Sequence, residues 1–254
     1  MAKRAVRQKP AGHGQAVRKV GGKSGKGKAD TLAGPAFKAW LEHLQNTGPT
    51  WLLPLTILAH QLCCRVTEIC RLRLQDFDLE NNFVLIGPLK RGEPLRKPLS
   101  ETARATIQAW IDKGGISIQR SRKWGNQGVK TFADSWKWPT KPEDHLFPPD
   151  RSDTKLAHRT KDAVSQAIRR TRATFVPPPV TEVKVGQIRS HSSRHRCIND
   201  LKSTNVNREV AKKFARIKSD RTYEGYGQIT AQQCAEDLAK HVPVQDLWKS
   251  IYEQ

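Results

Sequence analysis

The sequence has few acidic residues. Its 254 residues include 24 aspartates and glutamates against 45 lysines and arginines, which gives a formal net charge of +21 at pH 7. An excess this large goes beyond what solubility requires and predicts a polyanionic partner. Nucleic acid is the first candidate, and an anionic membrane surface is the competitor.

Long apolar runs are also missing. No stretch reaches the roughly 18 apolar residues that a membrane-spanning helix needs, and no apolar signal-peptide core follows the amino terminus. The sequence therefore predicts a soluble intracellular protein with no membrane partner. We expect it in the nucleus if the source is eukaryotic, and in the cytoplasm or nucleoid if the source is prokaryotic or viral.

Cysteine is scarce, and its five copies follow no regular spacing. No C-x-x-C pair is present, so a zinc site is not expected. Cys63 and Cys64 are neighbours in an apolar helical segment, which predicts reduced, buried thiols. We expect neither a metal nor a cofactor.

Residues 1–30 contain almost nothing that can pack and a single acid, Asp30. This composition predicts a disordered basic arm. We interpret it as a DNA-binding arm, because mobile cations gain affinity by displacing counterions from phosphates. A nuclear address, an organelle transit peptide and a solubilising tail are the alternatives. The candidate DNA contacts in the arm are Lys3, Arg4, Arg7, Arg18 and Lys19.

Residues 31–254 have the periodicity of one folded domain. The pattern predicts a mainly α-helical fold with a small antiparallel β-sheet, an α+β class. Predicted helices lie near 37–44, 51–64, 100–110, 158–174 and 243–252, and a predicted β-hairpin pairs 83–86 with 95–99 across a polar turn. The apolar stripe of 243–252 suits packing either on its own core or on a neighbouring protomer.

Residues 114–143 are rich in Gly, Lys, Arg and Trp and show no clear period, which predicts a long basic loop. Trp124, Trp136 and Trp138 lie in it. They either anchor the loop or stack on nucleic-acid bases.

Two segments far apart in the chain, 64–78 and 190–195, contain candidate phosphate ligands. Arg65 lies in the first, and His191 and Arg194 lie in the second. Planar arginine forks bind two phosphate oxygens together and keep their charge at any physiological pH. Residues three apart on a helix share a face, so we expect His191 and Arg194 to reach the same phosphate.

These segments resemble the boxes of the tyrosine recombinases, the phage integrase superfamily, over roughly residues 50–228. The family's first box, an Arg, a Glu, a Leu and an Asp-x-Asp, is matched by Arg65, Glu68, Leu72, Asp76 and Asp78. The second box, His-x-x-Arg-His, is matched by residues 191–195. The closing segment of the family's hairpin resembles 97–100, and its Leu-Phe-Pro resembles 146–148. Counting onward without a gap places Tyr226 at the family's nucleophile.

The resemblance implies a mechanism and a fold, the tyrosine recombinase catalytic domain. Tyr226 would attack a phosphodiester and form a covalent 3′-phosphotyrosine, which conserves the energy of the broken bond for rejoining. Arg65, Arg194 and His191 would stabilise the multiply charged transition state, and Lys90 in the hairpin turn would protonate the departing 5′ oxygen.

Two of these assignments have competitors. Tyr223 lies three residues before Tyr226 on almost the same helical face and is a second candidate nucleophile. Lys97 competes with Lys90 as the general acid. His195 is expected to pack or to support its neighbours.

The chain departs from the family pattern in its third box. The family has Gly-His or a Trp there, whereas ungapped counting places Arg216-Ile217 at this point. Ile217 cannot donate a hydrogen bond, so Arg216 or Lys218 would have to substitute. We also expect Arg91, Arg216 and Lys218 to contact DNA. A complete core-binding domain, which family members carry before the catalytic domain, is not expected.

The sequence therefore predicts a site-specific DNA recombinase or integrase that acts as a homotetramer on double-stranded DNA. A catalytically impaired integrase-like DNA-binding protein and a type IB topoisomerase-like enzyme are the alternatives. An RNA-binding protein is a third reading, which rests on charge alone.

Overall fold

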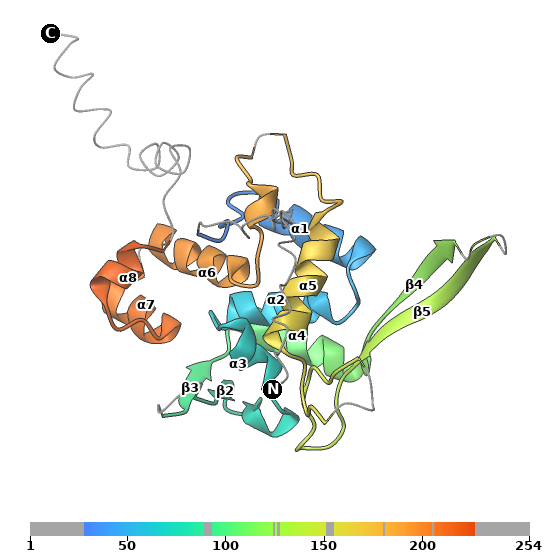
Figure 1. The fold of residues 1–254 in the computed structure, drawn as a ribbon. Helices are drawn as coiled ribbons and strands as arrows, with labels where there is room; N and C mark the ends of the chain where they lie inside the picture. The colour runs from blue at the N-terminus through green and yellow to red at the C-terminus, as the bar shows by residue number, and fades with distance from the viewer. Residues whose placement is uncertain are drawn as a thin grey trace, which may run out of the picture.

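The computed structural model describes residues 28–88, 93–123, 125, 128–150, 155–179, 181–204 and 206–226 (Figure 1). The five candidate DNA contacts of the basic arm, the turn residues Lys90 and Arg91, Trp124 and the helix predicted over 243–252 lie outside the described residues. Asp30 already belongs to the folded part. Its amide donates to the Gln187 carbonyl at 3.0 Å and its carboxylate accepts from the Lys184 amide at 2.7 Å.

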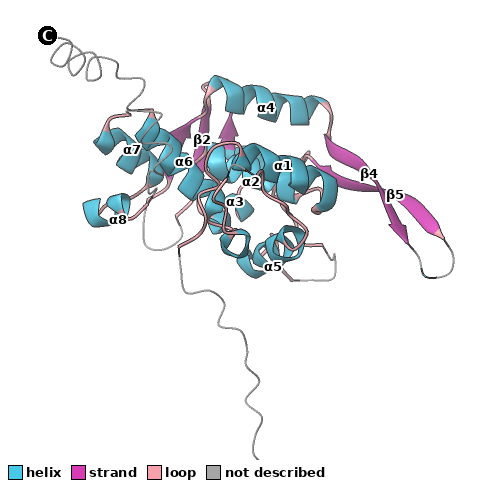
Figure 2. Ribbon diagram, turned by 90° about the horizontal axis from the view of Figure 1, so that it is seen from above, coloured by secondary structure: helices cyan, strands magenta, loops and turns pink. Residues whose placement is uncertain are grey.

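A bundle of helices forms the centre of the molecule. Its members are α1 (Ala36–Thr47), α2 (Leu52–Gln61), the short α3 (Val66–Cys70), α4 (Glu101–Asp112) and α5 (Lys161–Arg172). Figure 2 shows α2 between α4 on one side and α5 on the other. Leu52, Leu55 and Leu58 are buried on this central helix, as its nearly continuous apolar sequence predicts. Pro54 lies in its first turn, where a missing N–H costs nothing.

A three-stranded antiparallel sheet follows the bundle's first three helices. It consists of β1 (Phe77–Asp78), β2 (Phe83–Ile86) and β3 (Leu95–Pro98) in that order. The predicted hairpin is confirmed, with Val84 opposite Lys97. Helix α4 begins where predicted, because the Ser100 hydroxyl accepts a hydrogen bond from the Ala103 amide at 3.1 Å. The α+β class is also confirmed.

The prediction of a loop without regular structure over 114–143 is wrong. Two nine-residue strands, β4 (Gly115–Lys123) and β5 (Val129–Lys137), pair antiparallel there and project from the bundle as a ribbon (Figures 1 and 2). Trp136 and Trp138 are buried at the base of the ribbon, against Trp110 of α4. They anchor the ribbon, as one of the two sequence readings expects.

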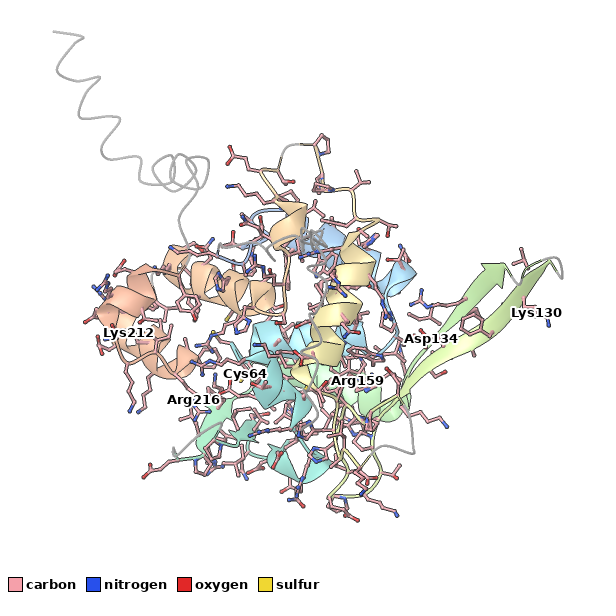
Figure 3. All side chains as sticks on the ribbon, viewed as in Figure 1. Cys64, Lys130, Asp134, Arg159, Lys212 and Arg216 are labelled. Atoms are coloured by element: carbon pink, nitrogen blue, oxygen red, sulfur yellow. The ribbon has the colours of Figure 1, made fainter. Side chains whose placement is uncertain are left out.

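Arg120 fixes the ribbon to the carboxyl-terminal end of α1. Its guanidinium binds the Asp134 carboxylate of the opposite strand at 3.1 Å and also donates to the carbonyls of Gln45, Asn46 and Gly48. Thr50 completes the contact, because its amide donates to the Asp134 carboxylate at 3.0 Å. Figure 3 shows Asp134 toward the base of the ribbon and Lys130 near its outer end.

A smaller group of helices forms the opposite end of the molecule. It contains α6 (Ser192–Ser203), α7 (Arg208–Ala215) and α8 (Asp220–Glu224) (Figure 1). These helices have an apolar cluster of their own, in which Cys63 is buried, whereas the next residue, Cys64, is buried in the main core. Cys63 and Cys64 are free buried thiols, as predicted. The candidate site lies where the two cores meet.

Candidate active site

Arg65 lies at the amino-terminal cap of α3, with extended backbone angles. Its amide donates to the Glu68 carboxylate at 2.7 Å, and its guanidinium lies 3.6 Å from the other oxygen of that carboxylate. The Arg65 side chain is 39 % exposed, whereas that of Glu68 is 1 % exposed. The buried carboxylate thus orients Arg65 and leaves part of its guanidinium open to a ligand.

Arg216 binds the same carboxylate from the far side. It caps the end of α7 in the left-handed region, with φ of 53°, and its guanidinium lies 3.1 Å from Glu68 and 3.2 Å from the Glu93 carbonyl (Figure 3). Glu68 therefore holds two arginines together. Arg216 joins the end of α7 to α3 and to the hairpin, while Lys218, the other candidate substitute donor, is exposed.

Arg194 lies at the floor of the site and is 1 % exposed. One of its terminal nitrogens donates to the Cys63 carbonyl and the other to the Ala215 carbonyl. Its Nε has no hydrogen-bond partner among the described residues. Cys63 lies two residues before Arg65, and Ala215 lies directly before Arg216. By binding both carbonyls, Arg194 links the segment that contains Arg65 to the segment that contains Arg216.

Lys97 is the second buried cation of the floor, again 1 % exposed. Its amine donates to the Leu62 carbonyl and lies 4.5 Å from the centre of the Phe214 ring. Lys97 binds the Leu62 carbonyl and Arg194 binds the Cys63 carbonyl. These two residues are consecutive at the end of α2, where a helix presents partial negative charge. A hydrogen bond with Cys197, together with the charges of Arg194 and Lys97, lowers the pKa of the Cys63 thiol to about 7 against the effect of burial.

The two histidines of the second box lie above this floor, at the start of α6. Burial lowers the pKa of His191, and the positive charges of Lys161, Arg194 and Arg65 lower it further. Burial also lowers the pKa of His195, to about 4. Both imidazoles are therefore neutral at pH 7, so each can donate or accept one hydrogen bond to a ligand.

Tyr226 packs against this second box. Its ring centre lies 4.7 Å from that of His195, in an edge-to-face arrangement, and 5.9 Å from the Arg194 guanidinium carbon. Tyr223 differs in being 4 % exposed, and burial raises the pKa of its hydroxyl. Tyr226 borders a pocket.

That pocket has a volume of about 380 Å³. Tyr226, His191 and His195 line one part of it, and Lys28 and Arg189 add two cationic side chains. The pocket suits an anionic ligand, because its lining contains cations, neutral imidazoles and a phenol, and no carboxylate is among the lining residues. The sequence interpretation missed Lys28 and Arg189, although Arg189 stands just before the second box.

Ile217 occupies the third-box position and is buried in the apolar cluster of the small lobe, beside Ala215 and Tyr223. Its side chain contributes packing there. The structure thus brings His195, Arg194 and Tyr226 into contact, and His191 and Tyr226 line the same pocket. Arg65 lies near enough for its charge to lower the pKa of His191, but no contact joins it to Tyr226 among the described residues. Lys90 is not among the described residues.

The described residues provide neither a metal site nor a membrane-spanning helix. No three His, Cys, Asp or Glu side chains in the described ranges are grouped so that they could hold a metal ion. Within the same ranges, no helix is both long and apolar enough to cross a membrane.

A family model for the phage integrase family matches residues 35–233, which is most of the chain. The chain belongs to the phage integrase family. The resemblance to the tyrosine recombinases is thereby confirmed, and so is the catalytic-domain fold. A comparison with curated proteins finds no significant match for this family member.

Solved recombinases share the fold of this phage integrase family member. XerA recombinase is 14 % identical with a TM-score of 0.56, and the match covers 81 % of this chain and 62 % of XerA. XerH site-specific recombinase, solved on its palindromic difH substrate, is 16 % identical with a TM-score of 0.55 and coverages of 85 % and 54 %. The Tn1549 transposon integrase, solved with transposon right end DNA, is 13 % identical with a TM-score of 0.52 and coverages of 85 % and 67 %. The chain spans less than two thirds of XerA and XerH.

Proposed function

We propose that this protein is a site-specific DNA recombinase that cleaves and rejoins double-stranded DNA through a covalent 3′-phosphotyrosine at Tyr226. The observation that carries the proposal is the contact of Tyr226 with the second box. A phenol, two neutral imidazoles and a guanidinium lie together beside a pocket with cationic walls. Family membership and the DNA-bound state of the XerH and Tn1549 structures support DNA as the substrate.

In the proposed reaction the Tyr226 hydroxyl loses its proton to solvent as its oxygen attacks the phosphorus, and the bond between phosphorus and the 5′ oxygen breaks. Arg65 neutralises the non-bridging oxygens with the exposed part of its guanidinium, and His191 donates a hydrogen bond. The departing 5′ oxygen takes a proton from Lys90, and the reverse attack by a 5′ hydroxyl restores the phosphodiester. Strand exchange between two DNA sites would need four such protomers on DNA, a homotetramer.

A second candidate function is DNA binding without turnover. It is favoured by Arg194, whose terminal nitrogens are bound to two backbone carbonyls below the surface, and by Ile217 at the third box. For catalysis, the Arg194 guanidinium would have to exchange a carbonyl for a phosphate oxygen or act through its charge. Tight DNA binding without cleavage is the result that this candidate predicts.

Nicked suicide DNA substrates distinguish these functions, because the cleaved fragment diffuses away and the covalent complex accumulates. We expect a protein–DNA adduct with the wild-type chain and none with Tyr226→Phe, because the phenylalanine lacks the attacking oxygen. Tyr223→Phe is the matched control and should still form the adduct. Binding without an adduct would support the second candidate, and relaxation of supercoiled DNA lacking any recognition site would favour the type IB topoisomerase activity.

A further inference from the structure

Lys202 binds the backbone of the segment that contains Tyr226. From the last turn of α6 its amine donates to the Tyr223 carbonyl at 3.0 Å and to the Tyr226 carbonyl at 2.7 Å. The Lys202 side chain is 14 % exposed, and its amine lies 4.0 Å from the Glu224 carboxylate. It also lies 4.6 Å from the centre of the Tyr223 ring.

The bound carbonyls lie at and just beyond the end of α8, a helix of five residues. The Tyr223 carbonyl also accepts a hydrogen bond from the Tyr226 amide at 3.0 Å, so Lys202 adds a second donor to it. A helix this short is marginal without outside contacts. A lysine amine at such an end supplies a donor to the carbonyls and complements their partial negative charge. Lys202 therefore adds to the backbone contacts that hold Tyr226 in position.

Lys202 shares its helix with the second box. Lys202 follows Arg194 by eight residues and His195 by seven along α6. This spacing places Lys202 about two turns from both, on the same side of the helix. His195 contacts the Tyr226 ring, while Lys202 binds its main chain. The tyrosine is thus held at two points by the same rigid element that presents Arg194.

We propose that Lys202 is a positioning residue that fixes the Tyr226 nucleophile relative to the second box. This inference rests on the proposed function and adds a residue to it. Displacing a reacting atom by about 1 Å is enough to lower a rate roughly 100-fold, so a side chain that fixes the tyrosine backbone acts on the chemical step. Two of the three N–H groups of the Lys202 amine are donated to carbonyls, so the role assigned to Lys202 is positioning and not acid catalysis.

The test compares Lys202→Met with Lys202→Arg and with Lys213→Met, a change at an exposed lysine of α7. Methionine keeps the apolar stem of Lys202 but donates no hydrogen bond, whereas arginine can still donate to both carbonyls. On suicide substrates at saturating protein, we expect Lys202→Met to form the adduct about 10- to 100-fold more slowly. Lys202→Arg should recover most of the rate. Affinity for the DNA should stay within about twofold, because no DNA contact is assigned to Lys202.

A substrate with sulfur in place of the 5′ bridging oxygen separates positioning from acid catalysis, since the thiolate leaves without a proton. We expect the slow cleavage by Lys202→Met to persist on this substrate. Restoration of the wild-type rate would assign Lys202 to proton transfer and overturn the inference. So would unchanged cleavage of the ordinary substrate by Lys202→Met.

Fluorine NMR of protein containing 3-fluorotyrosine tests the inference even if no adduct forms. The chain has three tyrosines, so each resonance can be assigned from single Tyr→Phe variants. The Tyr226 resonance should move or broaden in Lys202→Met and stay in place in Lys213→Met. An unmoved resonance contradicts the positioning role, whereas absence of the adduct in the wild-type chain contradicts the proposed function. If Lys202→Met fails to fold, Lys202→Gln, which is too short to reach both carbonyls, takes its place.

Discussion

At the scale of single residues, burial decides which charged side chains can meet a ligand. Arg65 and Arg194 were predicted as an equivalent pair, but Arg65 is partly exposed and Arg194 is at the floor. The sequence could not show this difference, because it depends on which carbonyls Arg194 meets. Those carbonyls, at Cys63 and Ala215, are 131 and 21 residues away along the chain. Glu68, in contrast, is buried and binds both Arg65 and Arg216.

His195 gives a prediction about pH. Its pKa is about 4 in the folded protein, against 6.5 for an unperturbed histidine, so only the unfolded chain takes up a proton between these values. The stability that the neutral buried imidazole provides is therefore complete above about pH 7 and is lost as the pH falls toward 4. The loss is at most about 3 kcal/mol. Urea unfolding at pH 7 and pH 5 measures it.

His195→Gln is the control, since glutamine does not titrate. Its free energy of unfolding should change less between the two pH values than that of the wild-type chain, although its value at pH 7 is lower. An equal pH dependence in both proteins would show that His195 is not the group responsible.

At the scale of elements, regular periodicity separates the correct predictions from the wrong one. The α2, α4 and α5 helices and the β2–β3 hairpin have clear apolar spacing and were predicted from it. The β4–β5 ribbon was not predicted, because its outer half packs on nothing among the described residues. Polar side chains there occupy both faces, including the hydroxyl pair Ser121 and Thr131, 3.2 Å apart. Alternation of apolar and polar residues indicates a strand with one buried face. The outer half of this ribbon lacks that alternation.

The ribbon's attachment gives a prediction for Arg120→Ala. This change removes the contacts to Asp134 and to three carbonyls at the carboxyl-terminal end of α1, while the contact between Asp134 and Thr50 remains. We expect a loss of about 2 kcal/mol in the free energy of unfolding, because hydrogen bonds to a charged group are involved. Amide hydrogen exchange in β4 and β5 should accelerate about tenfold or more.

Arg104→Ala is the matched control, since Arg104 is an exposed residue of α4. Its exchange pattern should stay that of the wild-type chain. If both variants exchange alike, the ribbon is held by its buried tryptophans and not by Arg120.

At the scale of the whole molecule, net charge is the property that follows most directly from the sequence. A formal charge of +21 predicts DNA affinity that depends steeply on salt. We expect the binding constant for duplex DNA to fall roughly 1000-fold or more between about 50 and 200 mM salt, as for six or more phosphate contacts. Fluorescence anisotropy over a salt series gives the slope.

Structured RNA of equal length is the comparison in that experiment. The family fold leads us to expect tighter binding to duplex DNA than to RNA at matched salt. A shallow slope, with binding that survives high salt, would show that phosphate contacts are few. A preference for RNA would favour the reading based on charge alone.

The boundary between the two apolar clusters has a mechanical consequence. Cys63 and Cys64 are consecutive residues, yet their side chains are buried in different cores, and Cys63 adopts a left-handed φ of 47°. Arg65 follows on the side of the large core, whereas Arg194 belongs to the small lobe and is bonded to the Cys63 carbonyl. The peptide between Cys63 and Cys64 is therefore the point at which the chain passes from one core to the other. Because Arg65 and Arg194 lie on opposite sides of this peptide, the spacing between the two arginines follows from how the two cores pack against each other.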